Sequence, residues 1–186
     1  MQEDTNMNTK DVLEQRRSIR KFKPGSITKD QMEELVHASQ MAPSWKNSQT
    51  ARYYVATSEE GMNKIRAGLP ERNAHHTIHA AALFVMTFKK DRSGFMQNGS
   101  PDNEVGNGWG FYDNGLATEN LLLKAYDMGF GTIVMGIRDE QILREQCQIP
   151  ADEIITSVIA LGIPDIHPTA PKRKEVSEII TYVDGE

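Results

Sequence analysis

Five residues near the start of the chain combine positive charge with a hydroxyl: Arg16, Arg17, Ser18, Arg20 and Lys21. A guanidinium is planar and can donate to two phosphate oxygens at once. A serine hydroxyl can donate to the same anion. The segment therefore indicates a phosphate clamp for a bound cofactor. The alternative is a solvated basic turn between two helices, because runs of charge usually face water.

Two further polar stretches could contribute to such a site. Residues 43–49 read Pro-Ser-Trp-Lys-Asn-Ser-Gln, and their amides and hydroxyls could bind the edge of a heteroaromatic ring. Taken alone, an ordinary connector explains this loop equally well. Residues 172–174 form a second basic group, for which a solvated tail is the alternative.

Three of the five histidines lie close together, at His75, His76 and His79. An i, i+4 spacing could place His75 and His79 on one helix face, as in some metal sites. No carboxylate ligand accompanies them, so we expect no metal. They are better explained as polar helix residues before a strand, with one touching a ligand.

Composition restricts the class of partner. The 186 residues are 38% hydrophobic and 25% charged, and the formal net charge is -5. A general nucleic-acid binder would be basic overall, so no nucleic-acid partner is expected. Local positive charge on an acidic protein suits a small anionic ligand.

The location expected from the sequence is the cytoplasm. Cys147 is the only cysteine in the sequence, which excludes an internal disulfide and favours a reducing compartment. We interpret Cys147 as a buried structural thiol. No apolar run is long enough to span a membrane, and residues 1–10 lack the apolar stretch of a signal peptide. No membrane partner is therefore expected.

The pattern of the chain predicts one α and β domain over residues 1–186, with a loose start at 1–9, a long loop or lid at 91–108 and a tail at 165–186. Thr28 with Gln31, and Thr57 with Glu60, have the spacing of helix capping boxes. Helices are expected at 11–17, 28–42, 57–69, 109–128 and 139–148. Strands are expected at 53–56, 82–88, 131–136, 157–164 and 178–183.

Two of these elements are strongly apolar. The continuous run at 82–88 predicts a strand that is buried on both faces. The helix at 109–128 is apolar on nearly all sides, which is typical of a central helix or a subunit interface.

Four segments together resemble the FMN-dependent nitroreductase family. They are residues 16–22, residues 42–49, residues 113–125 running into 129–132, and residues 161–164 followed by Lys172 and Arg173. The resemblance implies an α+β fold with a mainly antiparallel central sheet flanked by helices. It also implies a homodimer with two FMN sites, each built from both subunits, and with the helix at 109–128 packed across the dimer axis.

The resemblance assigns roles to particular residues. Arg16 and Arg173 would hold the FMN phosphate, and Ser18 would bond the flavin edge or ribityl chain. Arg20 would lie near flavin N1 and O2, where a fixed cation stabilises the charge of the reduced ring, and the Gly136 N–H would point at N5. The expected cofactor-binding set is Arg16, Arg17, Ser18, Arg20, Pro43, Ser44, Trp45, Asn47, Asn73, His76, Met135, Gly136, Lys172 and Arg173.

Several positions depart from the family pattern. Gln-Pro-Trp is the common ending of the second segment, and here it is Gln49-Thr50-Ala51. Trp45 stands where small residues are frequent, so its indole would narrow the substrate slot. His76 stands where lysine is usual, which would make the local charge depend on pH.

The activity implied by the resemblance is hydride transfer from NADH or NADPH through FMN N5 to a nitroaromatic, a quinone or a related oxidant, in two half-reactions. No side chain would be catalytic; Arg20 and Gly136 would assist. One alternative is a reductive dehalogenase or a dehydrogenase of the same fold, and the other is a flavin-binding module without turnover. No ribose-reading motif distinguishes NADH from NADPH.

Overall fold

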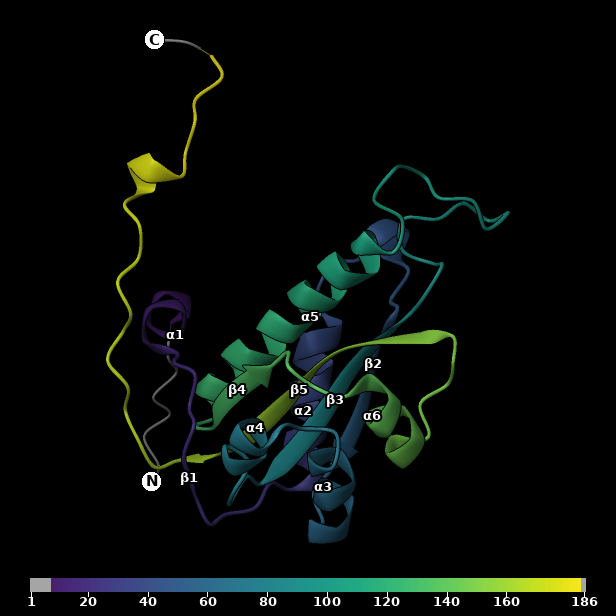
Figure 1. Ribbon diagram of the computed structural model, residues 1–186. Coiled ribbons are helices and arrows are strands. Elements are labelled where there is room, and N and C mark those ends of the chain that lie inside the picture. The colour runs from purple at the N-terminus through teal and green to yellow at the C-terminus, as the bar shows by residue number, and fades with distance from the viewer. Residues whose placement is uncertain (1–7, 185–186) are drawn as a thin grey trace.

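The computed structural model describes residues 8–184, and its centre is an antiparallel sheet of five strands (Figure 1). The strands run in the order β1-β5-β3-β2, and β4 also pairs with β5. Their bounds are β1 Phe22–Lys23, β2 Ala51–Ala56, β3 Ala82–Lys89, β4 Gly131–Met135 and β5 Glu153–Pro164. The predicted antiparallel sheet with flanking helices is confirmed.

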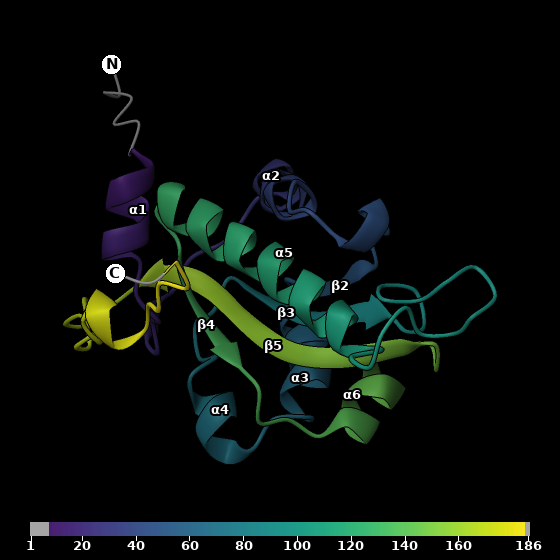
Figure 2. The ribbon, with the colours of Figure 1, turned by 90° about the horizontal axis from the view of Figure 1, so that it is seen from above.

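Helices and short 3-10 turns connect these strands. The α-helices are α1 Thr9–Gln15, α2 Lys29–Gln40, α3 Glu59–Arg66, α4 Glu71–His75, α5 Gly108–Asp127 and α6 Glu140–Cys147. The 3-10 turns are η1 Trp45–Asn47 and η2 Val176–Glu178. Seen from above, α2 and α5 lie over one face of the sheet, and α3, α4 and α6 lie under the other (Figure 2).

Burial of β3 on both faces is also confirmed. Leu83 and Val85 pack into the apolar cluster under α3 and α6, whereas Phe84 and Met86 pack into the cluster under α2 and α5. Alternate residues of a strand point to opposite faces, so a continuous apolar run fills both layers at once. A phenylalanine truncated in such a core typically costs about 3–5 kcal/mol, as we expect for Phe84.

Local capping signals locate two helix starts, one as predicted. The Thr28 hydroxyl accepts the Gln31 N–H at 3.2 Å, and the Gln31 side chain accepts the Thr28 N–H at 3.0 Å, so this capping box is confirmed. The assignment of Thr57 as a cap is wrong. Ser58 is the N-cap of α3 and accepts the Gly61 N–H at 3.1 Å, because the chain turns one residue later.

The predicted strand at 178–183 is wrong. The structure has η2 and then an irregular chain there, and the tail after Pro164 runs away from the sheet (Figure 1). Ile179 is 70% exposed and Val183 is 94% exposed. A weakly alternating segment that is exposed on all sides buries no apolar face, and burial of such a face is what holds a strand in a sheet. In residues 8–184 we find no helix with both the length and the apolarity to cross a membrane.

The long loop between β3 and α5 projects beyond the end of the sheet (Figure 1). Its ends are fastened together, because the Asn107 side chain donates to Asp91 at 2.8 Å and accepts the Asp91 N–H at 2.8 Å. Phe95 forms a bridge with Pro101 inside the loop. We call residues 90–107 the projecting loop.

Candidate functional site

The basic segment, residues 16–20, runs beside β4. The Ile19 N–H donates to the Thr132 carbonyl at 2.8 Å, and Ser18 forms a parallel bridge with Thr132. The buried Ile19 packs against Gly131, where an added Cβ would lie only 2.6 Å from Ile19 Cγ1. Glycine at position 131 is therefore what lets the basic segment approach the strand.

The arginines of this segment do not share one pocket. The half-buried Arg16 faces Glu119 at 3.7 Å. Arg17 donates to the carbonyls of Glu14 and Arg16 and lines a hollow with Tyr126 and Gly129. The exposed Arg20 lines a different hollow, because alternate residues of an extended chain point in opposite directions.

Arg20 and His76 line the same hollow, as the resemblance implies. Burial, and then the nearby charge of Arg20, lower the pKa of His76 below the usual 6.5. The imidazole is consequently neutral at pH 7, and Arg20 supplies the positive charge there. Within residues 8–184 Arg20 makes no ion pair, and the one hydrogen bond of its side chain is to the Ser18 carbonyl at 3.5 Å.

The end of β4 leaves open space at the predicted hydride position. Met135 is buried, whereas Gly136 is exposed, and a Cβ added to Gly136 would meet no atom within 4 Å. The Asn73 side chain donates to the Ile137 carbonyl at 2.9 Å. Asn73 therefore fixes the chain directly after Gly136.

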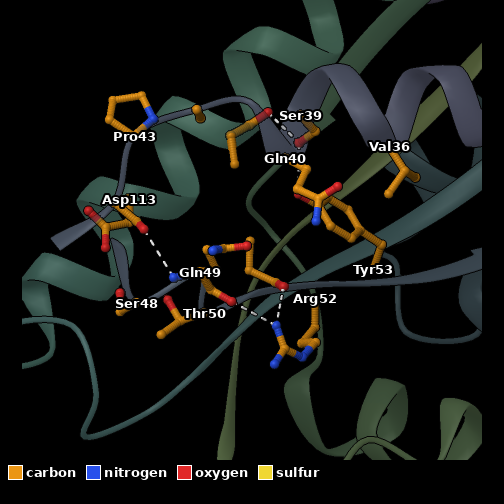
Figure 3. Close-up of a pocket in the computed structure, with 14 residues that line it drawn as sticks. Val36, Ser39, Gln40, Pro43, Ser48, Gln49, Thr50, Arg52, Tyr53 and Asp113 are labelled. Atoms are coloured by element: carbon orange, nitrogen blue, oxygen red, sulfur yellow. Dashed lines mark hydrogen bonds between the residues drawn. The ribbon is translucent and has the colours of Figure 1, made fainter. Parts of the chain in front are cut away.

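The second predicted group of residues lies elsewhere in the chain. Pro43 and Ser44 line a hollow of about 470 Å³ between α2, β2 and α5, together with Tyr53 and Asp113 (Figure 3). We call residues 43–50 the polar loop. Three of its residues other than glycine have positive φ: Lys46 at 47°, Asn47 at 56° and Gln49 at 47°. Such strain costs of order 1 kcal/mol each and clusters at binding sites.

Two carboxylates hold this polar loop in place. Asp113, 5% exposed, accepts the Trp45 N–H at 2.9 Å and the Ser93 hydroxyl at 2.6 Å. Asp102 accepts the Trp45 indole N–H at 3.0 Å and the Lys46 ammonium at 2.8 Å. The hydrogen bond from Lys46 holds the pKa of Asp102 below its usual 3.8.

The indole of Trp45 packs on the projecting loop and the start of α5. Its ring centroid lies 4.4 Å from that of Trp109. It does not line the hollow of Figure 3. Within a single chain, therefore, nothing supports the expectation that the Trp45 indole narrows a substrate slot.

Neither Asp102 nor Asp113 was predicted to position the site. An acidic residue within an otherwise apolar helix is a signal that could have pointed to Asp113, because a buried carboxylate needs hydrogen-bond donors. Asp102 lies in a loop rich in Gly, Asn, Asp and Ser, where one acid does not stand out.

The basic segment and the polar loop lie at opposite ends of α5. Asp113 holds Trp45 near the start of the helix, and Tyr126 donates to Gln15 at 3.2 Å near its end. At 1.5 Å per residue, about 20 Å separates these two contacts. One chain therefore does not bring the two predicted groups together.

The remaining expectations concern the basic tail residues, the histidines and Cys147. Lys172 and Arg173 are exposed in the tail and, within the described chain, make no ion pair or hydrogen bond with the basic segment. The placement of His75 and His79 on one helix face is wrong, because α4 ends at His75 and His79 has a φ of 60°. Cys147 is half-buried, and burial raises the pKa of its thiol.

Comparison with known proteins identifies the family. The sequence model of the nitroreductase family matches residues 13–163, so the chain belongs to this family. An NADPH-dependent oxidoreductase of Staphylococcus saprophyticus is 28% identical over 166 residues, which are 83% of this chain and 64% of that protein.

Solved structures share the fold. A nitroreductase family protein of Streptococcus pneumoniae superposes with a TM-score of 0.81 at 18% identity. The superposition covers 94% of this chain and 100% of the S. pneumoniae chain. A structure described as an oxidoreductase containing FMN superposes with a TM-score of 0.80 at 20% identity. This superposition covers 97% of the present chain and 94% of the oxidoreductase chain. These agreements confirm the family resemblance and the fold class.

Proposed function

We propose that the protein is an FMN-dependent oxidoreductase that moves a hydride from NADH or NADPH to a small electrophilic acceptor, such as a nitroaromatic or a quinone, by a ping-pong mechanism. The observation that carries this proposal is the match of the nitroreductase family over residues 13–163. The FMN described for one structural neighbour supports the same cofactor here.

The donors of the basic segment fit FMN. Arg16 and Ser18, two residues apart in the basic segment, offer the charged and hydroxyl donors that a phosphate monoester needs. Gly136 is exposed with free space where a side chain would stand, so a planar ring can approach its N–H closely. FMN, when bound, supplies a ring that accepts and returns a hydride. Asn73 keeps the backbone after Gly136 in a fixed position.

Arg20 supplies the positive charge near the C-terminal end of β4. It is exposed and unpaired within residues 8–184, so its guanidinium is available to a ligand. His76 beside it stays neutral at pH 7 and can donate or accept a hydrogen bond without adding charge. In the proposed site, Arg20 stabilises negative charge on the cofactor ring edge.

We infer that the site is completed by a second copy of the chain. The polar loop lies about 20 Å along α5 from the basic segment, too far for both to contact one flavin ring from the same chain. Two copies arranged about a twofold axis would place the polar loop of one beside the basic segment of the other, twice. Phe111 and Tyr112, 50% and 60% exposed on α5, offer apolar surface for such contacts.

The test is an absorption spectrum of the purified protein before and after anaerobic NADH or NADPH, with the mass measured by light scattering on the same sample. We expect flavin bands that bleach with at least one nucleotide, and a mass of two chains of 20.9 kDa each. A monomer that takes up no FMN overturns the proposal. Bound FMN that neither nucleotide bleaches would instead indicate a binding module without turnover.

A further inference from the structure

A second hollow lies beside the polar loop and shares Ser48, Thr50 and Arg52 with the hollow of Figure 3. Its volume is about 620 Å³. The rest of its lining comes from the end of β3, the start of the projecting loop and the turn before β5: Lys89, Lys90, Asp91, Arg92 and Asp152. We call it the basic hollow, because four of its eight lining residues are cations.

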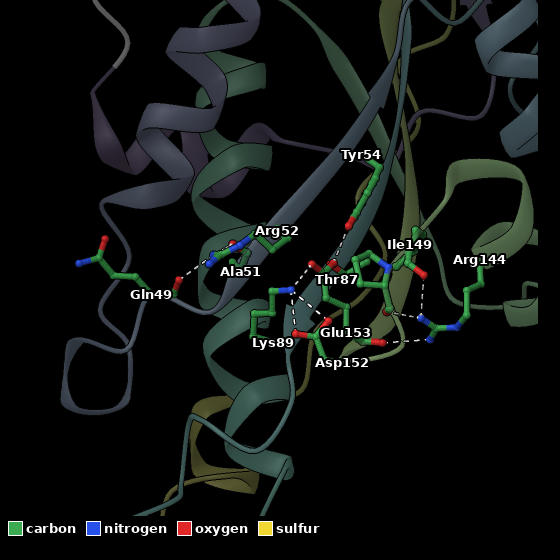
Figure 4. A network of polar contacts seen from close by, with 11 residues as sticks. Gln49, Ala51, Arg52, Tyr54, Thr87, Lys89, Arg144, Ile149, Asp152 and Glu153 are labelled. Carbon is green, nitrogen blue, oxygen red and sulfur yellow. Dashed lines mark hydrogen bonds and ion pairs between the residues drawn. The ribbon is translucent and has the colours of Figure 1, made fainter. Parts of the chain in front are cut away.

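Three of these cations have no carboxylate partner in the described chain: Arg52, Lys90 and Arg92. The fourth, Lys89, lies 3.0 Å from both Asp152 and Glu153 and forms ion pairs with them (Figure 4). Asp152 is bound to Lys89, and its charge also acts on the nearby Lys90.

The other acid of the lining is Asp91, which is held by the side chain of Asn107. Asp91 keeps its charge, so four cations against two acids leave the lining of the basic hollow with an excess of two positive charges, on a protein whose formal net charge is -5. Like charges that converge without partners repel one another, and a bound anion relieves that repulsion.

Arg52 connects the basic hollow to the proposed flavin site. Its guanidinium donates to the carbonyls of Gln49 at 2.9 Å and Ala51 at 2.8 Å (Figure 4). Gln49 in turn donates through its side chain to Asn47 at 3.2 Å, and Asn47 belongs to the expected flavin-binding set. An anion held by Arg52 would thus lie beside the loop that borders the flavin.

We propose that the basic hollow binds the 2′-phosphate of NADPH and so makes the protein prefer NADPH to NADH. This proposal rests on the proposed function, which places a nicotinamide dinucleotide over the flavin. Three unpaired cations match a phosphate monoester, whose charge near pH 7 is about -1.5 to -2. Each phosphate of a pyrophosphate carries less, and arginine is the residue that commonly accommodates a 2′-phosphate.

The first test measures binding without turnover. Isothermal titration of the full-length, FMN-loaded protein compares adenosine 2′,5′-bisphosphate with adenosine 5′-monophosphate. We expect the bisphosphate to bind at least about tenfold more tightly, and Lys90→Ala/Arg92→Ala to abolish that difference, since each charged hydrogen bond contributes a factor of this size. Lys29→Ala/Lys64→Ala removes the same charge from exposed helix positions and should keep the difference.

Arg52 needs a gentler change because it also bonds the polar loop. Arg52→Gln keeps an amide donor for the Gln49 carbonyl while removing the charge. We expect it to raise the KM for NADPH by about tenfold or more and to leave that for NADH within about twofold. The FMN content should stay at the wild-type level.

Several results would overturn the inference. Equal affinity of the wild type for the two adenosine nucleotides excludes a 2′-phosphate site. If Lys90→Ala/Arg92→Ala lowers the affinity for both adenosine nucleotides equally, the basic hollow binds the 5′-phosphate and not the 2′-phosphate. Either result with flavin still bleached by NADH refutes this inference alone. Failure of both dinucleotides to bleach bound FMN, with bisphosphate binding retained, refutes the proposed function and not the phosphate site.

Discussion

The carboxylate of Asp113 on α5 accepts the backbone N–H of Trp45 at 2.9 Å, so a helix residue fixes the start of the polar loop. The same oxygen accepts the Ser93 hydroxyl at 2.6 Å, and Ser93 lies 2.8 Å from the Ser48 hydroxyl. One buried acid therefore joins α5, the projecting loop and the polar loop. A loop with three left-handed residues needs such an anchor to keep its conformation.

Asp113→Ala should loosen the polar loop and weaken cofactor binding together. The substitution leaves the Trp45 N–H without its acceptor and removes the carboxylate that accepts the Ser93 hydroxyl, and a buried unpaired donor costs about 1–3 kcal/mol. We expect the free energy of unfolding, from urea titration, to fall by that amount and the Kd for FMN to rise.

Asp127→Ala is the matched control, because Asp127 lies on the same helix but pairs with Lys124. It should change stability by less than about 0.5 kcal/mol and leave the affinity for FMN unchanged. A destabilised Asp113→Ala protein with wild-type affinity for FMN would show that the loop does not contact the cofactor.

Arg20→Ala should slow flavin reduction without affecting the fold. The Arg20 side chain is exposed and, within residues 8–184, makes only a 3.5 Å hydrogen bond, so its removal should alter stability by less than about 0.5 kcal/mol. Loss of a fixed positive group at the ring edge should slow bleaching by NADH about a hundredfold in stopped-flow measurements. Lys29→Ala, exposed on α2 and outside the hollow that Arg20 lines, is the control and should bleach at the wild-type rate. Wild-type bleaching by Arg20→Ala at full FMN occupancy would refute the assigned role.

The parts of the fold that were predicted correctly depend on local signals. The capping box of Thr28 with Gln31 fixes a helix start within four residues, and the apolar run of β3 needs two covered faces. Ser58 was missed because it and Thr57 are equally good caps, and only the path of the chain decides between them. The positive φ of His79 likewise has no local signal, since the residue is not glycine.

The candidate site depends mainly on contacts between distant segments. The basic segment was recognised by composition, but its place beside β4 depends on pairing with Thr132 and on the close approach at Gly131. The strain of Lys46, Asn47 and Gln49 could not be predicted, because no glycine marks it and its anchors lie in α5 and the projecting loop.

Asp102→Asn should release the projecting loop from the polar loop. It removes the ion pair with Lys46 and weakens the bond to the Trp45 indole. The chain has two tryptophans, and the rings of Trp45 and Trp109 lie 4.4 Å apart at a tilt of 45°, so the intrinsic fluorescence reports this contact. We expect a red-shifted emission and faster tryptic cleavage after Arg92.

Glu104→Gln provides the comparison for Asp102→Asn. Glu104 is an exposed acid of the same projecting loop, and its substitution should leave both the emission spectrum and the cleavage rate unchanged. Unaltered fluorescence in Asp102→Asn would mean that the contact of Trp45 with Trp109 does not depend on Asp102.

Glu153, at the start of β5, is an acid-sensitive point of the fold. It is 3% exposed and accepts hydrogen bonds from Tyr54 at 2.9 Å and Thr87 at 2.5 Å, with Lys89 at 3.0 Å (Figure 4). Burial pushes its pKa up, but the bonds from Thr87, Lys89 and Tyr54 outweigh burial and hold the pKa below the usual 4.5. Burial and the bond to Glu153 raise the pKa of Tyr54 to about 12.

A folded-state pKa below the unfolded value means that the folded protein favours ionised Glu153. The resulting stability is fully present above pH 4.5 and is lost as the pH falls through the lower folded-state pKa. Glu153→Gln removes this contribution, so it should lower the free energy of unfolding at pH 7 and make its decline on acidification below pH 4.5 shallower than in the wild type. Urea titrations at several pH values measure both effects, with exposed Glu60→Gln as the control. An identical decline in Glu153→Gln and wild type would show that the three donors do not hold the carboxylate ionised.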